Sequence, residues 1–245
     1  MSHPSSLEGA SAPRSWVIIP AAGIGSRMSA DRPKQYLKLG SRTVLECALA
    51  CFAHDHRFSG VVLAIAMDDP WWPSLVLDAS VPVHVVPGGS ERAESVSHAL
   101  DLLAALGEPE DWVLVHDAAR PLLASEDLDR LIAVLEHDEV GGLLAAPVRD
   151  TMKRADAEGC VARTEPREGL WHALTPQMFR LGMLRDSLRR AREAGLAVTD
   201  EASAIEYVGL RPKLVEGRAD NIKITRSEDL DLAAFHIARR KGYEV

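Results

Sequence analysis

Short apolar segments alternate with amphipathic segments along most of this chain of 245 residues. The apolar segments are hydrophobic on both faces, as buried parallel strands are, and they cover residues 16–20, 61–66, 83–86, 112–116 and 143–148. Stretches with helical periodicity lie between them, at residues 43–54, 91–106 and 125–136. This alternation predicts an α/β fold with a mostly parallel, doubly wound sheet and right-handed crossovers.

Local signals predict the helix ends and the C-terminal third of the chain. Thr43 and Glu46 have the spacing of a capping box at the start of the first helix, and Ser125 is the expected N-cap of the third. Near the C-terminus we expect helices at residues 180–195 and 199–208, short strands at 213–215 and 222–225, and a closing amphipathic helix at 227–241. Without an internal repeat or a second core, residues 15–245 are expected to form a single domain.

One polar segment interrupts this pattern. Residues 151–166 alternate in polarity around a turn near Glu158 and Gly159, which predicts a protruding β-hairpin arm at about residues 150–167. Because an isolated hairpin is marginally stable in water, we expect the arm to pack on a second subunit, which would make the protein a homodimer. Residues 1–14 are rich in Ser, Pro and small residues and are expected to form a disordered tail.

Composition and charge argue against several classes of protein. A formal net charge of −8 disfavours a broad nucleic-acid surface. The apolar runs are far shorter than the roughly 20 residues that span a bilayer, and no signal peptide is evident, so a cytoplasmic protein without membrane association is expected. The three cysteines lack CxxC spacing, which indicates a reducing compartment. Cys47 and Cys51, with His54 and His56 after them, could bind zinc, but two core residues on one helical face is the favoured interpretation.

The segment after the first apolar run, residues 20–36 (PAAGIGSRMSADRPKQY), combines small residues with cations. Its two glycines allow backbone N–H groups to approach a triphosphate, and Arg27 and Lys34 add positive charge. A dinucleotide fingerprint would need a third glycine where Met28 stands, and no Walker-type lysine follows, but a purely structural turn is an open alternative. In a parallel sheet this segment converges with residues 87–95 and 116–121 at the carboxyl ends of the strands, where ligands bind.

The same segment resembles the signature of the sugar- and polyol-phosphate nucleotidyltransferases. Six later motifs narrow the resemblance: GGSERAESV (88–96), VHDAARP (115–121), APVRDTMKR (146–154), GLWHALTPQMF (169–179), TDEASAIE (199–206) and VEGRADNIKIT (215–225). Together they resemble the 2-C-methyl-D-erythritol 4-phosphate cytidylyltransferases of the non-mevalonate isoprenoid pathway. The resemblance implies a Rossmann-like sheet of the nucleotidyltransferase type and a Mg²⁺-dependent transfer of the cytidylyl group from CTP to methylerythritol phosphate, with release of pyrophosphate.

Within that resemblance, one group of residues is implied to bind CTP: Ala21, Ala22, Gly23, Gly25, Gly89, Ser90, Ser95, Asp117 and Ala118. Arg27 and Lys34 match the residues that stabilise the transition state on the triphosphate. Ser95 and nearby backbone groups would read the edge of the cytosine. Asp117 would lie near the metal ion or the ribose.

A second group is implied to bind methylerythritol phosphate: Thr151, Arg167, Thr175, Thr199, Asp220 and Lys223. Lys223 resembles the lysine that orients the attacking phosphate, and Arg167 joins it among the implied catalytic residues. Thr151 and Arg167 belong to the arm, which in the family reaches into the neighbouring subunit. Both would therefore act across a dimer interface.

Simpler interpretations stay open for three of these residues. Ser90 could be the N-cap of the next helix, with Arg92 on the surface. Asp117 could be an N-cap or the partner of Arg120, and Thr199 opens a segment with the pattern of a helix start.

Other functions compete with the implied one. A cytidylyltransferase for another polyol phosphate, such as ribitol 5-phosphate, would share the CTP half of the site, but the substrate-side motifs favour methylerythritol phosphate. An NAD-type oxidoreductase is disfavoured by Met28. A nucleotide-binding module without catalysis would not need cations for both substrates, so the combination of Arg27, Lys34, Arg167 and Lys223 disfavours it.

Overall fold

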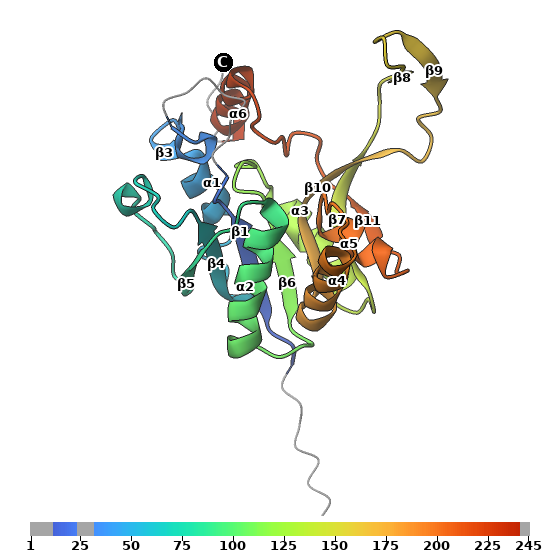
Figure 1. Ribbon diagram of the computed structural model, residues 1–245. Helices are drawn as coiled ribbons and strands as arrows, with labels where there is room; N and C mark the ends of the chain where they lie inside the picture. Colours follow the sequence, from blue (N-terminus) through green and yellow to red (C-terminus); the bar gives the residue numbers. More distant parts are fainter. Residues whose placement is uncertain (1–11, 24–31, 241–245) are drawn as a thin grey trace, which may run out of the picture.

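The computed structural model describes residues 12–23 and 32–240. Its centre is a seven-stranded sheet in the order β11-β7-β10-β6-β1-β4-β5 (Figure 1). The strands are β1 (Ser15–Pro20), β4 (Phe58–Ile65), β5 (Val83–Pro87), β6 (Trp112–Val115), β7 (Gly141–Pro147), β10 (Trp171–Arg180) and β11 (Lys213–Glu216). The pairings in this sheet are parallel except those of β10, which runs antiparallel to β6 and β7. The expected mostly parallel α/β fold is confirmed.

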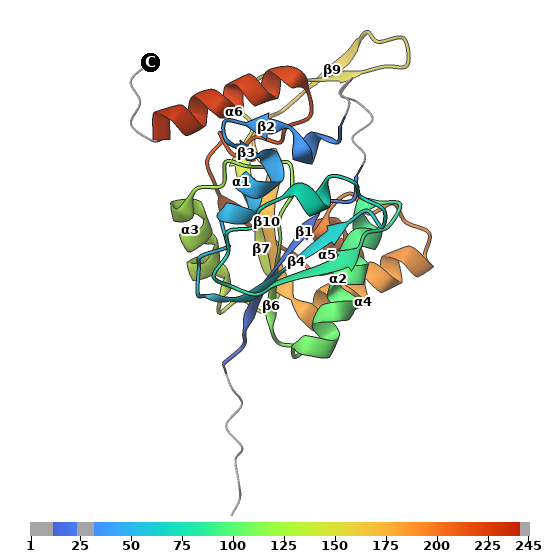
Figure 2. The ribbon, with the colours of Figure 1, turned by 90° about the vertical axis from the view of Figure 1, so that its left-hand side faces the viewer.

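Helices cover both faces of the sheet, and β1 shows how the two cores are divided. Val17 and Ile19 point to the core under α1 (Val44–Ala50) and α3 (Ser125–Leu135). Ile18, between them, points to the core under α2 (Arg92–Leu106), α4 (Leu181–Glu193) and α5 (Glu201–Tyr207). Successive side chains of a strand alternate between faces, so a strand covered on both sides is apolar throughout. Figure 2 shows α3 on one side of the sheet and α2 and α4 on the other.

A smaller core lies under the C-terminal helix α6 (Ser227–Arg240). This helix packs on the short hairpin of β2 (Lys38–Leu39) and β3 (Arg42–Thr43) (Figure 1). Leu39, Leu122, Ile224 and Ala233 are buried together there. The core therefore holds the segments that follow β1, β6 and β11 beside one another. In the described part of the chain, no helix has the length and apolar character needed to cross a membrane.

The predicted arm is a β-hairpin that projects from the body of the molecule (Figure 1). Its strands are β8 (Met152–Ala155) and β9 (Val161–Glu165), which pair antiparallel. Arg154 and Arg163 both form ion pairs with Glu165, and most side chains of the two strands are exposed.

The sequence predicts no strand where β10 lies. The middle of this strand carries Thr175, Pro176 and Gln177, so it lacks the apolar run that marks the other strands of the sheet. Its place between β6 and β7 comes from long-range pairing, which periodicity does not reveal.

Two local expectations are wrong. Residues 222–225 form no strand, because Ile224 N–H donates to the Ala119 carbonyl at 2.8 Å and Thr225 N–H donates to the Asp229 carboxylate at 2.8 Å. The segment thus bonds to the turn after β6 and to α6. Ser125 is the first residue of α3 instead of its N-cap, because the N–H of Leu128 already donates to the carbonyl of Ala124.

The capping box at the start of α1 is confirmed. Thr43 N–H donates to the Glu46 carboxylate at 2.5 Å, and Glu46 N–H donates to the Thr43 hydroxyl at 3.2 Å.

We expect Thr43→Ala to lower the free energy of unfolding by about 1 kcal/mol, because the N–H of Glu46 loses its acceptor. Urea denaturation followed by circular dichroism measures this loss. Ser41→Ala, in the exposed turn two residues earlier, is the control and should change stability by less than about 0.5 kcal/mol. Equal losses in the two variants would contradict the capping role of Thr43.

Candidate active site

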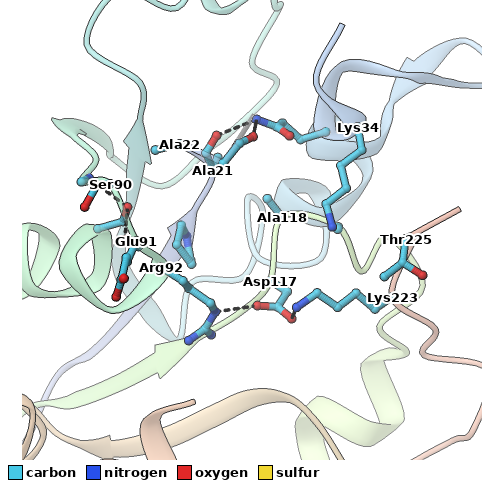
Figure 3. Close-up of a pocket in the computed structure, with 16 residues that line it drawn as sticks. Ala21, Ala22, Lys34, Ser90, Glu91, Arg92, Asp117, Ala118, Lys223 and Thr225 are labelled. Atoms are coloured by element: carbon cyan, nitrogen blue, oxygen red, sulfur yellow. Dashed lines mark hydrogen bonds and ion pairs between the residues drawn. The ribbon is translucent and has the colours of Figure 1, made fainter. Parts of the chain in front are cut away.

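A pocket of about 330 Å³ opens at the carboxyl ends of the central strands. Its wall comes from the segment after β1, the loop between β5 and α2, the turn after β6 and the loop before α6 (Figure 3). The lining residues are Pro20, Ala21, Ala22, Gly23, Lys34, Gln35, Gly89, Ser90, Glu91, Arg92, Ser95, Asp117, Ala118, Ala119, Lys223 and Thr225. The volume suits a small-molecule site, and the position is the usual one for ligands in parallel α/β sheets.

Most residues implied to bind CTP line this pocket. They are Ala21, Ala22, Gly23, Gly89, Ser90, Ser95, Asp117 and Ala118. Lys34 and Lys223 line it as well, and Figure 3 shows their side chains approaching Asp117 and Ala118 from different segments. Gly25 and Arg27 lie outside the described residues.

The loop between β5 and α2 is stabilised by hydrogen bonds within the loop and by a close contact with the segment after β1. Gly89 N–H donates to the Ser95 hydroxyl at 3.0 Å, and that hydroxyl donates to the Glu91 carbonyl at 3.2 Å. A Cβ added to Gly88 would collide with the Cβ of Ala22. Glycine at position 88 therefore lets the loop touch the segment after β1, and Ser95 holds the loop in shape.

Ser90 sits at the exposed edge of this loop. Its N–H and hydroxyl donate to the Glu94 carboxylate at 2.7 and 2.9 Å. The N-cap position of α2 belongs to Glu91, so the interpretation of Ser90 as N-cap is wrong by one residue.

Asp117, two residues after the end of β6, is the centre of a cluster of charges on the pocket floor. Arg92 Nε lies 2.9 Å from its Oδ1, Lys223 Nζ lies 2.9 Å from its Oδ2, and Arg120 Nε lies 3.5 Å from Oδ2 (Figure 3). Only 6% of Asp117 is exposed. Burial opposes ionisation, but the charges of Arg92 and Lys223 outweigh it and hold the pKa of Asp117 well below its usual range. The carboxylate is therefore ionised at neutral pH.

Arg92 and Glu201 are site residues that the sequence interpretation missed. The Arg92 guanidinium forms a two-pronged contact with Glu201, at 2.6 Å to Oε1 and 3.0 Å to Oε2, while its Nε holds Asp117. Glu201 is fully buried at the start of α5. Both residues open helices at the ligand-binding edge of the sheet, which is a signal that the sequence contains. Arg92 is half-buried between two carboxylates, so the alternative that places it on the surface is wrong.

A chain of hydrogen bonds supports Asp117 from below. Asp117 N–H donates to the Thr175 hydroxyl at 3.2 Å, and Thr175 Oγ1 lies 3.0 Å from His116 Nδ1. His116 Nε2 lies 2.9 Å from the Arg120 carbonyl, which can only accept, so Nε2 carries the proton and Nδ1 accepts from Thr175. Burial lowers the pKa of His116 to about 4, in agreement with a neutral ring. Thr175 therefore lies under the pocket and does not line it.

The loop that carries Lys223 is fixed on both sides of this residue. Arg120 donates to the Asn221 carbonyl at 2.6 Å, and the Asn221 side chain donates to the Thr175 carbonyl at 2.8 Å. Ile224 is held by the Ala119 carbonyl. These bonds orient Lys223 toward Asp117.

Besides Thr175, four residues implied to bind the alcohol phosphate do not line the pocket. Thr151 and Arg167 are exposed at the base of the arm, where Arg167 donates to the Arg149 carbonyl. Thr199 is exposed before α5.

Asp220 is the fourth residue outside the pocket. Its carboxylate is engaged by Arg218 and Arg240 at 2.7 and 3.1 Å, and its pKa is lowered to about 2, chiefly by Arg218. These contacts tie the loop that carries Lys223 to α6.

The described residues contain no group of three or more His, Cys, Asp or Glu side chains that could hold a metal ion. Asp117 and Glu91 are the acids that line the pocket, and the oxygens of Asp117 are shared by three cations. At phosphates, Mg²⁺ is commonly held by one or two carboxylates together with phosphate and water oxygens. The oxygens of Asp117 are of the donor type that Mg²⁺ takes, but each of them already faces a cation, so a metal ion at this carboxylate would have to share it with Arg92 or Lys223.

Cys47 and Cys51 are partly buried and pack against two different cores, so they do not share one helical face as expected. Cys51 packs against the core under α1, and Cys47 packs against the core under α6. Burial raises the pKa of Cys51 to about 12, and its Sγ lies 3.5 Å from the Cys47 carbonyl.

The depressed pKa of His116 predicts a pH dependence of stability. Between about pH 6.5 and pH 4 the unfolded chain binds a proton that the folded chain excludes, so the free energy of unfolding should fall as the pH is lowered through this range. The loss from this residue should reach about 3 kcal/mol. Urea denaturation at several pH values measures this loss. In His116→Gln, which keeps a donor for the Arg120 carbonyl, the free energy of unfolding should depend less steeply on pH than in the unsubstituted protein. Equally steep pH dependences in the two proteins would contradict the low pKa of His116.

Comparison with known proteins agrees with this geometry. Residues 15–239 match the family described as "IspD: 2-C-methyl-D-erythritol 4-phosphate cytidylyltransferase". The chain is 59% identical over 216 residues to the 2-C-methyl-D-erythritol 4-phosphate cytidylyltransferase of Ectopseudomonas mendocina, covering 88% of this chain and 92% of the relative. It is 58% identical over 220 residues to that of Pseudomonas entomophila, covering 89% and 94%.

Solved structures agree with the sequence relatives. The crystal structure of the Francisella tularensis 2-C-methyl-D-erythritol 4-phosphate cytidylyltransferase superimposes with a TM-score of 0.79 at 37% identity, covering 91% of this chain and 99% of that one. A crystal structure of a 4-diphosphocytidyl-2C-methyl-D-erythritol synthase gives 0.79 at 38% identity, with coverage of 92% and 99%. The fold, the pocket and these relatives together place the chain in the 2-C-methyl-D-erythritol 4-phosphate cytidylyltransferase family.

Proposed function

We propose that the protein transfers the cytidylyl group of CTP to 2-C-methyl-D-erythritol 4-phosphate, giving 4-diphosphocytidyl-2-C-methyl-D-erythritol and pyrophosphate, with the pocket as its active site. The observation that carries this assignment is the pair of lysines, Lys34 and Lys223, that line one pocket from separate segments beside an ionised Asp117. Two anionic substrates must meet there, and a cation from each segment suits both of them.

The segment after β1 and the loop between β5 and α2 are proposed to bind CTP. Small residues at positions 21–23 and 89 leave the backbone accessible, and a Cβ on Gly23 would meet no atom of the described residues within 4 Å. Packing against the described residues therefore does not require glycine at this position, which would leave room for a phosphate. Lys34 would lie against the triphosphate, with Arg27 as a second cation from the same segment.

The reaction needs positioning and charge stabilisation more than a protein nucleophile. An oxygen of the methylerythritol phosphate attacks the α-phosphorus of CTP, and the bond from that phosphorus to the oxygen of the leaving pyrophosphate breaks. A phosphate monoester is largely dianionic at pH 7, so it needs no general base. Lys223, held by Asp117, would orient the attacking phosphate, and Lys34 would stabilise charge on the departing pyrophosphate.

Mg²⁺ is the proposed metal ion, and Asp117 is the proposed protein ligand. When bound with CTP, the ion would neutralise part of the triphosphate charge. Arg92 would keep the Asp117 carboxylate in place through its Oδ1.

The arm is proposed to complete the alcohol-phosphate side in a homodimer. Thr151 and Arg167 are exposed and lie outside the pocket of their own subunit. Residues of an arm that projects from the body can reach a second copy, and the arm's exposed strands would be stabilised by packing there. Three further residues are proposed to act on the methylerythritol phosphate side of the site, either by contacting the polyol or by holding the residues that do. They are Thr175, Thr199 and Asp220.

We expect pyrophosphate release from CTP and Mg²⁺ only when methylerythritol phosphate is added. A coupled pyrophosphate assay with methylerythritol phosphate or ribitol 5-phosphate as acceptor tests this. Equal turnover with ribitol 5-phosphate would overturn the substrate, and no turnover with either acceptor would overturn the assigned reaction.

Arg167→Ala should raise the KM for methylerythritol phosphate at least about tenfold, because a charged hydrogen bond to the phosphate is lost, and should leave the KM for CTP nearly unchanged. Steady-state kinetics with each substrate varied in turn separates the two effects. Arg163→Ala, on the same arm but paired with Glu165, is the matched control and should behave as the unsubstituted protein does. Unchanged kinetics in Arg167→Ala would remove this residue from the site.

A further inference from the structure

Gln35 joins the two parts of the pocket wall that are proposed to hold the triphosphate. It is 3% exposed and lies in a short 3-10 turn, Lys34–Tyr36. Its side-chain amide donates to the Ala21 carbonyl at 2.7 Å and to the Gly23 carbonyl at 3.0 Å. Figure 3 shows these two bonds as dashed lines between the segment that carries Lys34 and the segment that carries Ala21.

The chemistry of the amide suits this position. A neutral primary amide has two N–H donors, and in Gln35 each of them meets one carbonyl of the glycine-rich segment. Both carbonyl oxygens carry partial negative charge, which would repel a phosphate if they faced it unpaired. With both oxygens bound to Gln35, the backbone at residues 21–23 is oriented in a pocket that must accept several negative charges.

The turn itself has a second, independent anchor. Tyr36 is buried, and its hydroxyl donates to the Asp69 carboxylate at 2.7 Å. Burial, together with the hydrogen bond to Asp69, raises the pKa of Tyr36 above its usual range, so the phenol stays protonated and remains a donor. Because this anchor faces the loop after β4 and not the glycine-rich segment, the turn can stay in place when the Gln35 contacts are removed.

We propose that Gln35 is a positioning residue for the nucleotide: it sets the backbone of residues 21–23 at a fixed separation from Lys34, so that both act on the same triphosphate. This role rests on the CTP site proposed above. Gln35 acts through the groups it holds, and its effect should therefore appear in CTP binding and in kcat but not in the binding of the alcohol phosphate.

The test compares Gln35→Met with Tyr36→Phe. Met keeps the length of Gln and loses both donors, so CTP should bind about tenfold or more weakly by isothermal titration calorimetry, and kcat should fall. The KM for methylerythritol phosphate should stay within about twofold. Tyr36→Phe removes the other anchor of the same turn; it should lower the melting temperature and leave CTP binding within about twofold.

A second variant, Gln35→Glu, keeps the shape of Gln and places an anionic carboxylate against the two carbonyls. It should weaken CTP binding more than Gln35→Met does. Wild-type CTP affinity in either Gln35 variant, or an equal loss of affinity in Tyr36→Phe, would overturn the proposal. These outcomes are distinct from a failure of the assigned reaction, in which the unsubstituted protein itself would release no pyrophosphate from CTP and methylerythritol phosphate.

Discussion

The contact on which the site depends is the sharing of one buried carboxylate, Asp117, by cations from three segments. Arg92 comes from the start of α2, Arg120 from the turn after β6, and Lys223 from the loop before α6. A buried carboxylate is stable only when paired, and removing one partner from such a group is costly. The cluster therefore ties the start of α2 and the turn after β6 to the loop that carries Lys223. Glu201 extends the cluster to α5, because both of its carboxylate oxygens accept hydrogen bonds from the Arg92 guanidinium.

The fold brings these segments together through β10. Because this strand runs antiparallel between β6 and β7, it carries Thr175 under the end of β6, where its hydroxyl accepts from the Asp117 N–H. His116 and the Asn221 side chain bond to the same residue, so the turn after β6 and the loop before α6 share one support. This hydrogen-bonded floor holds the charged side chains in place. In the proposed reaction they would meet the substrates, and a preorganised set of charges is what phosphoryl transfer requires.

Whether a feature could be predicted from the sequence depends on how far apart along the chain the interacting residues lie. The apolar strands β1, β4, β6 and β7 and the capping box at Thr43 depend on near neighbours, and they are predicted correctly. Residues 21–23, Lys34, Asp117 and Lys223 follow strand ends or match family motifs, and the structure gathers them at one edge. Other features depend on partners outside the local sequence. They are strand β10, the ion pair of Arg92 with Glu201, and the two hydrogen bonds from Gln35 to the glycine-rich segment. Periodicity contains no information about such pairs. The arm is predicted as a hairpin from its alternating polarity and its turn, which are local signals.

The most direct test of this account is a crystal structure of the protein with a non-hydrolysable CTP analogue. The triphosphate should lie between the backbone of residues 21–23 and Lys34, with Lys223 on the far side and Arg92 still bridging Asp117 and Glu201. A nucleotide bound outside this pocket, or an Arg92 side chain that leaves both carboxylates when the nucleotide binds, would contradict the claim that the Asp117 cluster organises the site.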